Sequence, residues 1–236
     1  MTTFVFVHGS WHGGWCWQRV ARLLRQRGHD VYTPTLTGLG ERSHLVSPES
    51  GLNLHIQDIR QVLEYEDLQD VVLTGHSYGG MVITGVAEES WERIAHLVYL
   101  DAYVPQDGQS EFDLRPDLRE RRERLAAAGE QGWLVPSPDP ASWGITDAAD
   151  VAWVGSRLTP MPLLTYQESV QTPAGRPQQL PRTFIVCTGG RNTFYATAQE
   201  ARAEGWGYYE LETGHDAMIT MPAELTEILL QLATKG

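Results

Sequence analysis

The most constraining feature of this sequence is a tight turn in which Gly75, Ser77 and Gly79 alternate with His76 and Tyr78. Apolar residues 71–73 precede the turn, and residues 81–86 continue as an apolar helix. Glycines are required on both sides because larger side chains would collide where the chain reverses so sharply. A turn of this kind between a strand and a helix holds the serine in a strained conformation with its hydroxyl exposed. The pattern therefore predicts a strand–turn–helix unit with Ser77 as a nucleophile.

Strand-like and helix-like segments alternate along much of the chain, which predicts an α/β fold with a mostly parallel sheet flanked by helices. About six strands are expected, at residues 4–7, 29–33, 70–73, 97–100, 181–187 and 208–211. Pro222 is suited to the first position of a closing helix, because its missing N–H has no partner there.

Residues 102–180 interrupt this alternation, with many prolines, spaced aromatics and no clear strand candidate. We predict a single domain in which residues 1–101 and 181–236 form the core and residues 102–180 form an inserted helical lid. Ligands in open α/β sheets bind beyond the carboxyl ends of the strands, where such a lid would lie.

Composition excludes several classes of protein. The two cysteines, Cys16 and Cys187, rule out a disulfide framework and a CxxC metal or redox motif. A net charge of −12 disfavours nucleic acid and anionic membranes as partners, and no apolar run approaches the roughly 20 residues of a membrane helix. The N-terminal residues do not resemble a signal peptide, so a cytoplasmic location is expected. No nucleotide or metal-binding motif is present, and we expect neither a cofactor nor a metal.

A serine nucleophile needs a base, and His215 is the best candidate. It follows the last expected strand, which satisfies the order serine, acid, histidine along the chain. The other seven histidines precede the serine or lie close after it.

The developing oxyanion needs backbone N–H donors, and two are predicted. One is that of Tyr78, directly after the nucleophile, and the other is that of Ser10, in the glycine-rich loop after the first strand.

Three motifs together resemble a known group: HGSWHGGWCW at residues 8–17, TGLGERSH at 37–44 and GHSYGG at 75–80. They are similar to the methylesterase and hydroxynitrile lyase branch of the α/β hydrolases, and closer still to its bacterial carboxylesterase and carbendazim-hydrolase-like members. The resemblance implies an α/β-hydrolase fold and a serine esterase with a catalytic triad. Hydroxynitrile lyases of this branch carry a lysine where this chain has Asp216 and a threonine where it has Gly9, so lyase activity is disfavoured.

The triad acid departs from the resemblance. Relatives usually place an aspartate soon after the strand at 181–187, but the matching position here is Gly190, and no carboxylate occurs before Glu200. Asp101, at the end of the strand at 97–100, is the best substitute, because some α/β hydrolases take their acid from that place. Asn192 is the alternative, as a neutral orienting group.

We therefore expect a serine hydrolase that cleaves a small ester or carbamate through an acyl-serine intermediate. Its triad would be Ser77, His215 and Asp101. Trp11, Trp153 and Tyr166 are the aromatic residues expected to contact the substrate. A lyase or biosynthetic cyclase at the same site, and a binding protein that has lost turnover, remain as alternatives.

Overall fold

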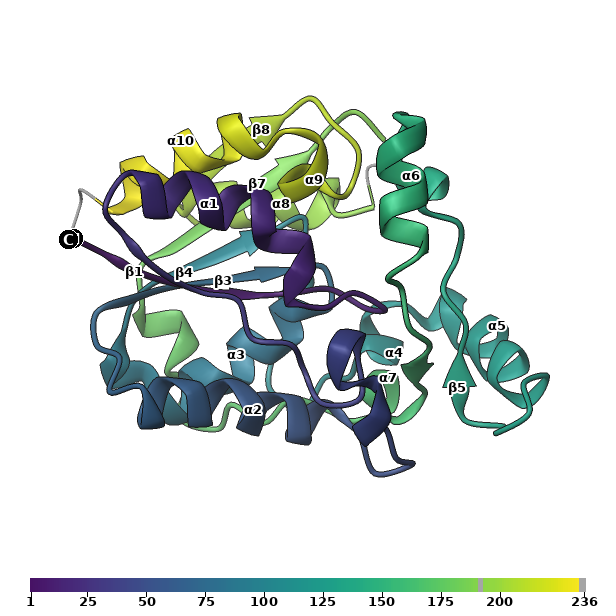
Figure 1. Cartoon of the computed structure of the whole chain (residues 1–236). Helices are drawn as coiled ribbons and strands as arrows, with labels where there is room; N and C mark the ends of the chain where they lie inside the picture. The colour runs from purple at the N-terminus through teal and green to yellow at the C-terminus, as the bar shows by residue number, and fades with distance from the viewer. Residues whose placement is uncertain (191–192, 234–236) are drawn as a thin grey trace.

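The computed structural model describes residues 1–190 and 193–233, and its centre is a six-stranded sheet (Figure 1). The strand order is β2-β1-β3-β4-β7-β8, and all five pairings are parallel. The strands are β1 Thr3–Val7, β2 Asp30–Tyr32, β3 Val71–His76, β4 Ile94–Leu100, β7 Arg182–Cys187 and β8 Gly207–Leu211. The predicted α/β architecture is confirmed.

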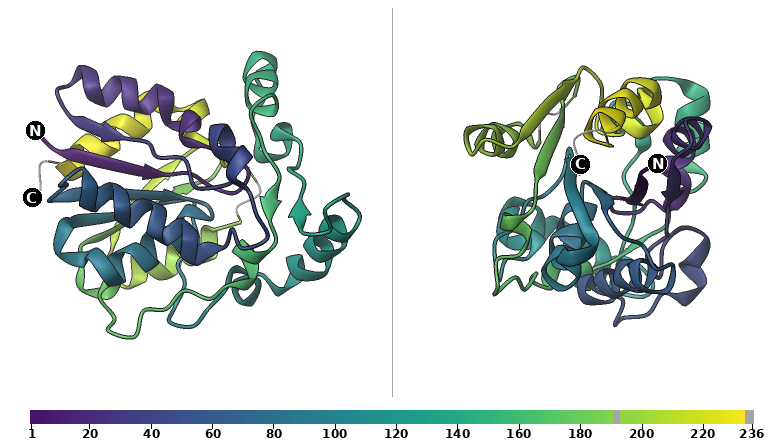
Figure 2. Two further views of the ribbon diagram at one scale, coloured as in Figure 1. Left: turned by 60° about the horizontal axis from the view of Figure 1, so that its bottom comes forward. Right: turned by 90° about the vertical axis from the view of Figure 1, so that its left-hand side faces the viewer.

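Helices cover both faces of this sheet (Figures 1 and 2). On one face α1 packs against α10, and on the other α2 packs against α3. The bounds are α1 Gln18–Gln26, α2 Leu52–Tyr65, α3 Gly79–Ser90, α8 Tyr195–Ala203, α9 Ala217–Thr220 and α10 Pro222–Ala233. Short 3-10 helices are η1 Gly14–Trp17, η2 Gly40–Leu45, η3 Trp91–Arg93, η4 Pro140–Trp143 and η5 Pro177–Gln179.

The alternation of side chains along β1 shows how the sheet divides the core. Val5 and Val7 belong to the apolar cluster that includes α2 and α3, whereas Phe4 and Phe6 belong to the cluster that includes α1 and α10. All four are fully buried, and burial of each contributes roughly 1.5–3 kcal/mol. A strand buried on both faces reads as the continuous apolar run seen in the sequence.

The segment between β4 and β7 forms a wall beyond the carboxyl ends of the strands (Figures 1 and 2). It contains α4 Glu111–Leu114, α5 Pro116–Ala127, β5 Leu134–Val135, α6 Ala148–Gly155, β6 Met161–Pro162 and α7 Leu164–Gln167. The expectation that this segment lacks strands was wrong, since β5 and β6 pair in antiparallel orientation. Strands of two residues are too short to produce a periodic signal in a sequence.

Within the described ranges, no helix is both long and apolar enough to cross a membrane.

Candidate active site

Ser77 occupies a strained turn between β3 and α3. Its φ angle is +54°, in the left-handed region that residues with a β-carbon rarely adopt. The surrounding backbone holds it there: Ser77 N–H donates to the Leu100 carbonyl at 3.2 Å, and the Ser77 carbonyl accepts from Gly80 at 3.0 Å and from Tyr103 at 3.2 Å. Strain of this kind costs about 1–3 kcal/mol and persists only when neighbouring contacts enforce it.

The flanking glycines are required by close backbone approaches. A β-carbon at Gly75 would lie 2.5 Å from the Gly79 carbonyl oxygen, and one at Gly79 would lie 2.6 Å from the carbonyl oxygen of Val7 in β1. Real β-carbons do not make contacts this short. The two glycines therefore allow the turn to close against the neighbouring strand.

Two backbone N–H groups near Ser77 have no acceptor among the described residues. Among the described residues, neither Ser10 nor Tyr78 donates its backbone N–H to another protein group. The loop that carries Ser10 lies against the turn, because a β-carbon at Gly9 would sit 2.9 Å from that of Ser77. The same closeness shows that a threonine at position 9 would require the loop or the turn to move.

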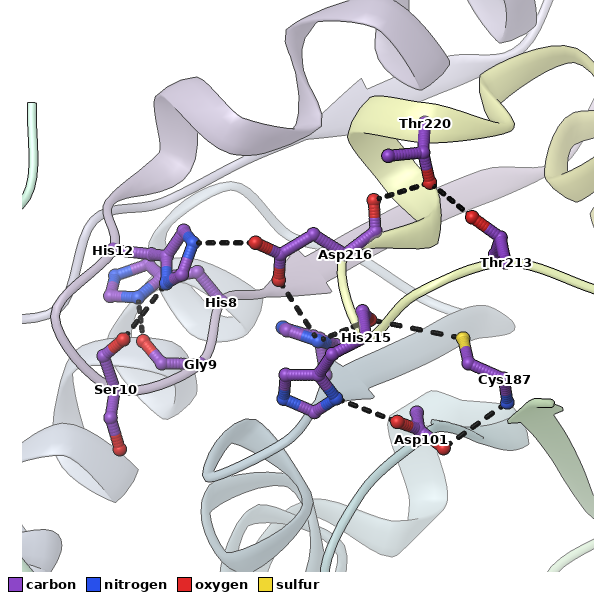
Figure 3. A network of polar contacts seen from close by, with 11 residues as sticks. His8, Gly9, Ser10, His12, Asp101, Cys187, Thr213, His215, Asp216 and Thr220 are labelled. Atoms are coloured by element: carbon purple, nitrogen blue, oxygen red, sulfur yellow. Dashed lines mark hydrogen bonds and ion pairs between the residues drawn. The ribbon is translucent and has the colours of Figure 1, made fainter. Parts of the chain in front are cut away.

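Asp101 and His215 form a short contact next to this turn (Figure 3). Asp101 Oδ2 accepts from His215 Nδ1 at 2.6 Å, and its Oδ1 accepts from the Cys187 N–H at 3.1 Å. Asp101 has a φ of +41°, and its own N–H donates to the Ile185 carbonyl at 2.7 Å. The carboxylate is thus fixed by β7, the strand next to β4, in a position that orients the His215 ring.

The environment of His215 favours its protonated form. Burial by itself lowers the pKa of His215, but the hydrogen bond and charge of Asp101, together with the charge of Asp216, outweigh it and raise the pKa above 6.5. Phe194 stacks on the ring with centroids 5.7 Å apart. The backbone N–H of His215 donates to the carbonyl of Trp143, in the inserted segment, at 2.8 Å.

The other acid candidates do not reach His215 within the described residues. Gly190 has no side chain, and among the described residues a β-carbon there would meet only the Gly214 α-carbon, at 3.5 Å. Asn192 lies outside the described residues. The carboxylate of Asp216 points away from the Nδ1 side of His215, toward His12 and the neighbouring strand β3 (Figure 3).

A cavity of about 720 Å³ joins these groups. Ser77, Asp101 and His215 line it from the core, and α5 and η4 line it from the inserted segment. This volume lies within the usual range of small-molecule sites, roughly 300–1,000 Å³.

Of the three aromatic residues predicted to contact substrate, only Trp11 lines this cavity. Tyr166 is fully buried beneath it, with the Arg122 guanidinium 3.9 Å from its ring centre. Trp153 packs edge-on against Trp15, with ring centroids 5.1 Å apart. Neither Tyr166 nor Trp153 is among the residues that line this cavity, and substrate contact by them stays a prediction.

The structure adds cavity residues that the sequence did not single out. Tyr103, Trp143 and Phe194 contribute aromatic surface, and Arg122 contributes a cation from α5. Arg122 forms a buried ion pair with Glu111 of α4. The sequence shows many spaced aromatic residues, but it does not show which of them line the cavity. Only the fold decides that.

One group of described residues has donor atoms of the kind that bind metals. Atoms of His76, His215 and Asp216 lie within 4.8 Å of one another. Hydrogen bonds already occupy two of the imidazole nitrogens, since His76 Nε2 donates to the His215 carbonyl at 3.1 Å and His215 Nδ1 donates to Asp101. The arrangement is therefore that of a hydrogen-bonded histidine cluster.

Comparison with known proteins places this geometry in a family. A sequence profile of the alpha/beta hydrolase family matches residues 4–228. The chain is 39% identical over 242 residues to a carbendazim hydrolyzing esterase of Nocardioides sp. (strain SG-4G), covering 98% of this chain and 100% of that protein. It is 28% identical to methylesterase 10 of Arabidopsis thaliana, over 98% of this chain and 92% of that one.

A solved structure agrees with these sequence comparisons. An extracellular α/β-hydrolase from a Paenibacillus species, which shares structural and functional homology with tobacco salicylic acid binding protein 2, matches with a TM-score of 0.87. The two chains are 25% identical, and the match covers 100% of each. The profile, the relatives and the strained serine turn lead to one conclusion: the chain belongs to the α/β-hydrolase family.

Proposed function

We propose that this protein hydrolyses a small carboxylic ester or carbamate through an acyl-serine intermediate. Ser77 is the nucleophile, His215 the general base and Asp101 the acid that orients it. The observation that carries the proposal is the 2.6 Å contact between Asp101 and His215, at a cavity that Ser77 also lines. The esterases and methylesterases among its relatives support the same reaction class.

In the first half of the reaction, the Ser77 oxygen attacks the substrate carbonyl carbon and His215 Nε2 accepts the hydroxyl proton. Asp101 accepts the Nδ1 proton in a hydrogen bond, so Nε2 is the nitrogen left to act as base. The carbonyl oxygen becomes an oxyanion and accepts hydrogen bonds from the Ser10 and Tyr78 N–H groups. When the tetrahedral intermediate collapses, His215 returns the proton to the leaving alcohol or amine.

In the second half, water replaces the leaving group. His215 removes a proton from the water as its oxygen attacks the acyl carbon, and the same N–H groups bind the second oxyanion. Collapse then breaks the bond to Ser77, whose oxygen takes the proton back from His215. The acid product leaves and the free enzyme is restored.

The cavity favours a substrate with a flat or apolar group. Trp11, Trp143 and Phe194 supply aromatic surface to its lining. The name of the bacterial relative, a carbendazim hydrolyzing esterase, supports aryl carbamates as one candidate class, and those of the plant relatives support methyl esters as the other.

A fluorophosphonate probe tests the mechanism. We expect the folded protein to become covalently labelled on Ser77, as mapped by peptide mass spectrometry, and Ser77→Ala to lose both labelling and hydrolysis of p-nitrophenyl acetate. Absence of labelling at Ser77 in the folded protein would contradict the proposal. A panel of methyl esters and aryl carbamates, compared by kcat/KM, then distinguishes the two substrate classes.

A further inference from the structure

A second carboxylate lies behind His215, outside the cavity. Asp216 is fully buried, with its Oδ2 3.5 Å from His12 Nε2 and its Oδ1 3.6 Å from His76 Nε2 (Figure 3). Both distances are longer than hydrogen bonds, and within the described residues neither carboxylate oxygen has a hydrogen-bond partner. A buried carboxylate of this kind needs a positive charge nearby, because isolated buried charges are very costly.

His12 is one of two buried histidines that lie beside this carboxylate. Its Nδ1 lies 2.8 Å from the Ser10 carbonyl oxygen, and its Nε2 faces the Asp216 carboxylate. The Ser10 carbonyl oxygen only accepts hydrogen bonds, so His12 Nδ1 carries a proton and donates it there. Burial by itself raises the pKa of Asp216, but the nearby histidines, His12 foremost, outweigh it and lower that pKa to about 2.

The two partners belong to the two loops that the reaction must bring together. His12 holds the carbonyl of Ser10, the residue whose N–H faces the oxyanion, and Asp216 directly follows the base His215. Asp216 is fixed in turn by α9, since its carbonyl accepts from Ile219 at 2.9 Å and from Thr220 at 3.1 Å. No other ion pair between described residues joins the loop after β1 to the loop after β8.

We propose that His12 and Asp216 are positioning residues, a buried pair whose contact holds the oxyanion loop and the base loop in register. The inference rests on the function proposed above. Neither side chain lines the cavity, so the pair acts through Ser10 and His215 rather than on substrate. Displacement of a reacting group by about 1 Å can reduce a rate by 10²-fold, which makes the register of these loops consequential.

The pair also affects the protonation of His215. The groups that face His215 are Asp101 from the end of β4, His76 from the end of β3, Cys187 from the end of β7, and the pair itself. The charge of Asp216 is one of the causes that raise the pKa of His215. Removing that charge therefore lowers the pH at which His215 becomes protonated.

The decisive variant is Asp216→Asn, which keeps the shape and removes the charge. We expect kcat for p-nitrophenyl acetate to fall by about 10- to 100-fold, KM to change little, and the acidic limb of kcat/KM to move to lower pH. His12→Asn can still donate a hydrogen bond to the Ser10 carbonyl, so this variant should lower kcat less than Asp216→Asn does. The double variant should be no worse than Asp216→Asn alone, because the two residues act as one unit.

The matched control is Asp150→Asn, which breaks the ion pair of Asp150 with Arg19 and leaves both loops intact. It should keep the kcat and pH profile of the unaltered protein. An Asp216→Asn variant that folds and keeps both the kcat and the acidic limb of the unaltered protein would overturn the proposed role of the pair. If that variant does not fold, an unaltered kcat in His12→Asn would overturn it, and a reduced kcat with unaltered KM would support it. Failure of the unaltered protein to label on Ser77 would instead overturn the proposed function.

Discussion

At the scale of single residues, Asp101 links the strands to the chemistry. Its carboxylate accepts from Cys187 on one oxygen and from His215 on the other, so it cannot rotate without losing both contacts. A carboxylate held in this way orients the imidazole and stabilises the imidazolium that forms when Ser77 is deprotonated.

Replacing Asp101 tests that role. We expect Asp101→Asn to lower kcat by roughly 10⁴-fold, because the amide favours the wrong imidazole tautomer. Adding Gly190→Asp should recover part of the loss, since a β-carbon at Gly190 would make an ordinary van der Waals contact, 3.5 Å from the Gly214 α-carbon, and the position lines the same cavity. Steady-state kinetics on p-nitrophenyl acetate measures both effects. Normal rates in Asp101→Asn would mean that this triad is wrong.

The raised pKa of His215 predicts a pH profile. Catalysis requires the neutral ring, so kcat/KM should fall as the pH drops through a value above 6.5, the ordinary pKa of histidine. The protonated ring is the form that Asp101 stabilises, so its contribution to stability is complete below pH 6.5 and is lost as the pH rises through the raised pKa. A pH–rate profile whose acidic limb falls at or below 6.5 contradicts the expected direction.

At the scale of elements, the ion pair of Glu111 with Arg122 joins α4 to α5 at the edge of the cavity. The Glu111 side chain is fully buried, and that of Arg122 is 10% exposed. The Arg122 guanidinium also lies over the ring of Tyr166, which connects the pair to α7. Such a pair need not add net stability, but losing one partner leaves a buried charge without compensation.

Glu111→Gln should therefore destabilise the fold by about 3 kcal/mol, as measured by urea unfolding. The matched control is Glu120→Gln, which removes an exposed pair with Arg124 on the same helix. Exposed pairs contribute little, so the control should unfold at the urea concentration of the unaltered protein. Equal urea-unfolding midpoints for Glu111→Gln and Glu120→Gln would show that the buried pair does not stabilise the inserted segment.

At the scale of the whole molecule, buried neutral histidines support the core beside the site. His8 Nε2 accepts from the Leu36 N–H at 3.1 Å, and His55 Nδ1 accepts from the Tyr78 hydroxyl at 3.0 Å. Burial is the main cause that lowers the pKa of His8 to about 3 and that of His55 to about 4. Protonating either ring would break a hydrogen bond on which the site depends.

These histidines predict acid sensitivity. Below pH 6.5 the unfolded chain binds protons that the folded chain does not, so their contribution to stability is complete above pH 6.5 and is lost toward pH 3–4. The free energy of unfolding should fall by about 3 kcal/mol between pH 7 and pH 5. Urea unfolding at the two pH values measures this, and His55→Gln should reduce the slope. Equal free energies of unfolding at pH 7 and pH 5 would contradict the lowered pKa values of His8 and His55.

Local features of the chain account for what could be predicted before the structure. The strained turn at Ser77 could be predicted because its glycines lie within a few residues of the serine, and His215 because it follows the last expected strand in the order serine, acid, histidine. The sheet follows from apolar runs whose periodicity reflects burial on both faces. The inserted segment has no such regularity, so its short strands were missed, and the sequence could not select which of its aromatic side chains line the cavity.

The sequence by itself determined the family, the sheet, and the residues proposed as nucleophile, base and oxyanion donors. Only the tertiary structure decided which carboxylate reaches His215. Asp101 does so because β4 pairs with β7, with Leu100 opposite Ile185, which brings the end of β4 beneath the loop after β8. It also decided that Asp216 faces His12 instead. Both outcomes depend on contacts between segments more than 80 residues apart in the sequence. A local sequence pattern cannot predict which of such distant segments come into contact.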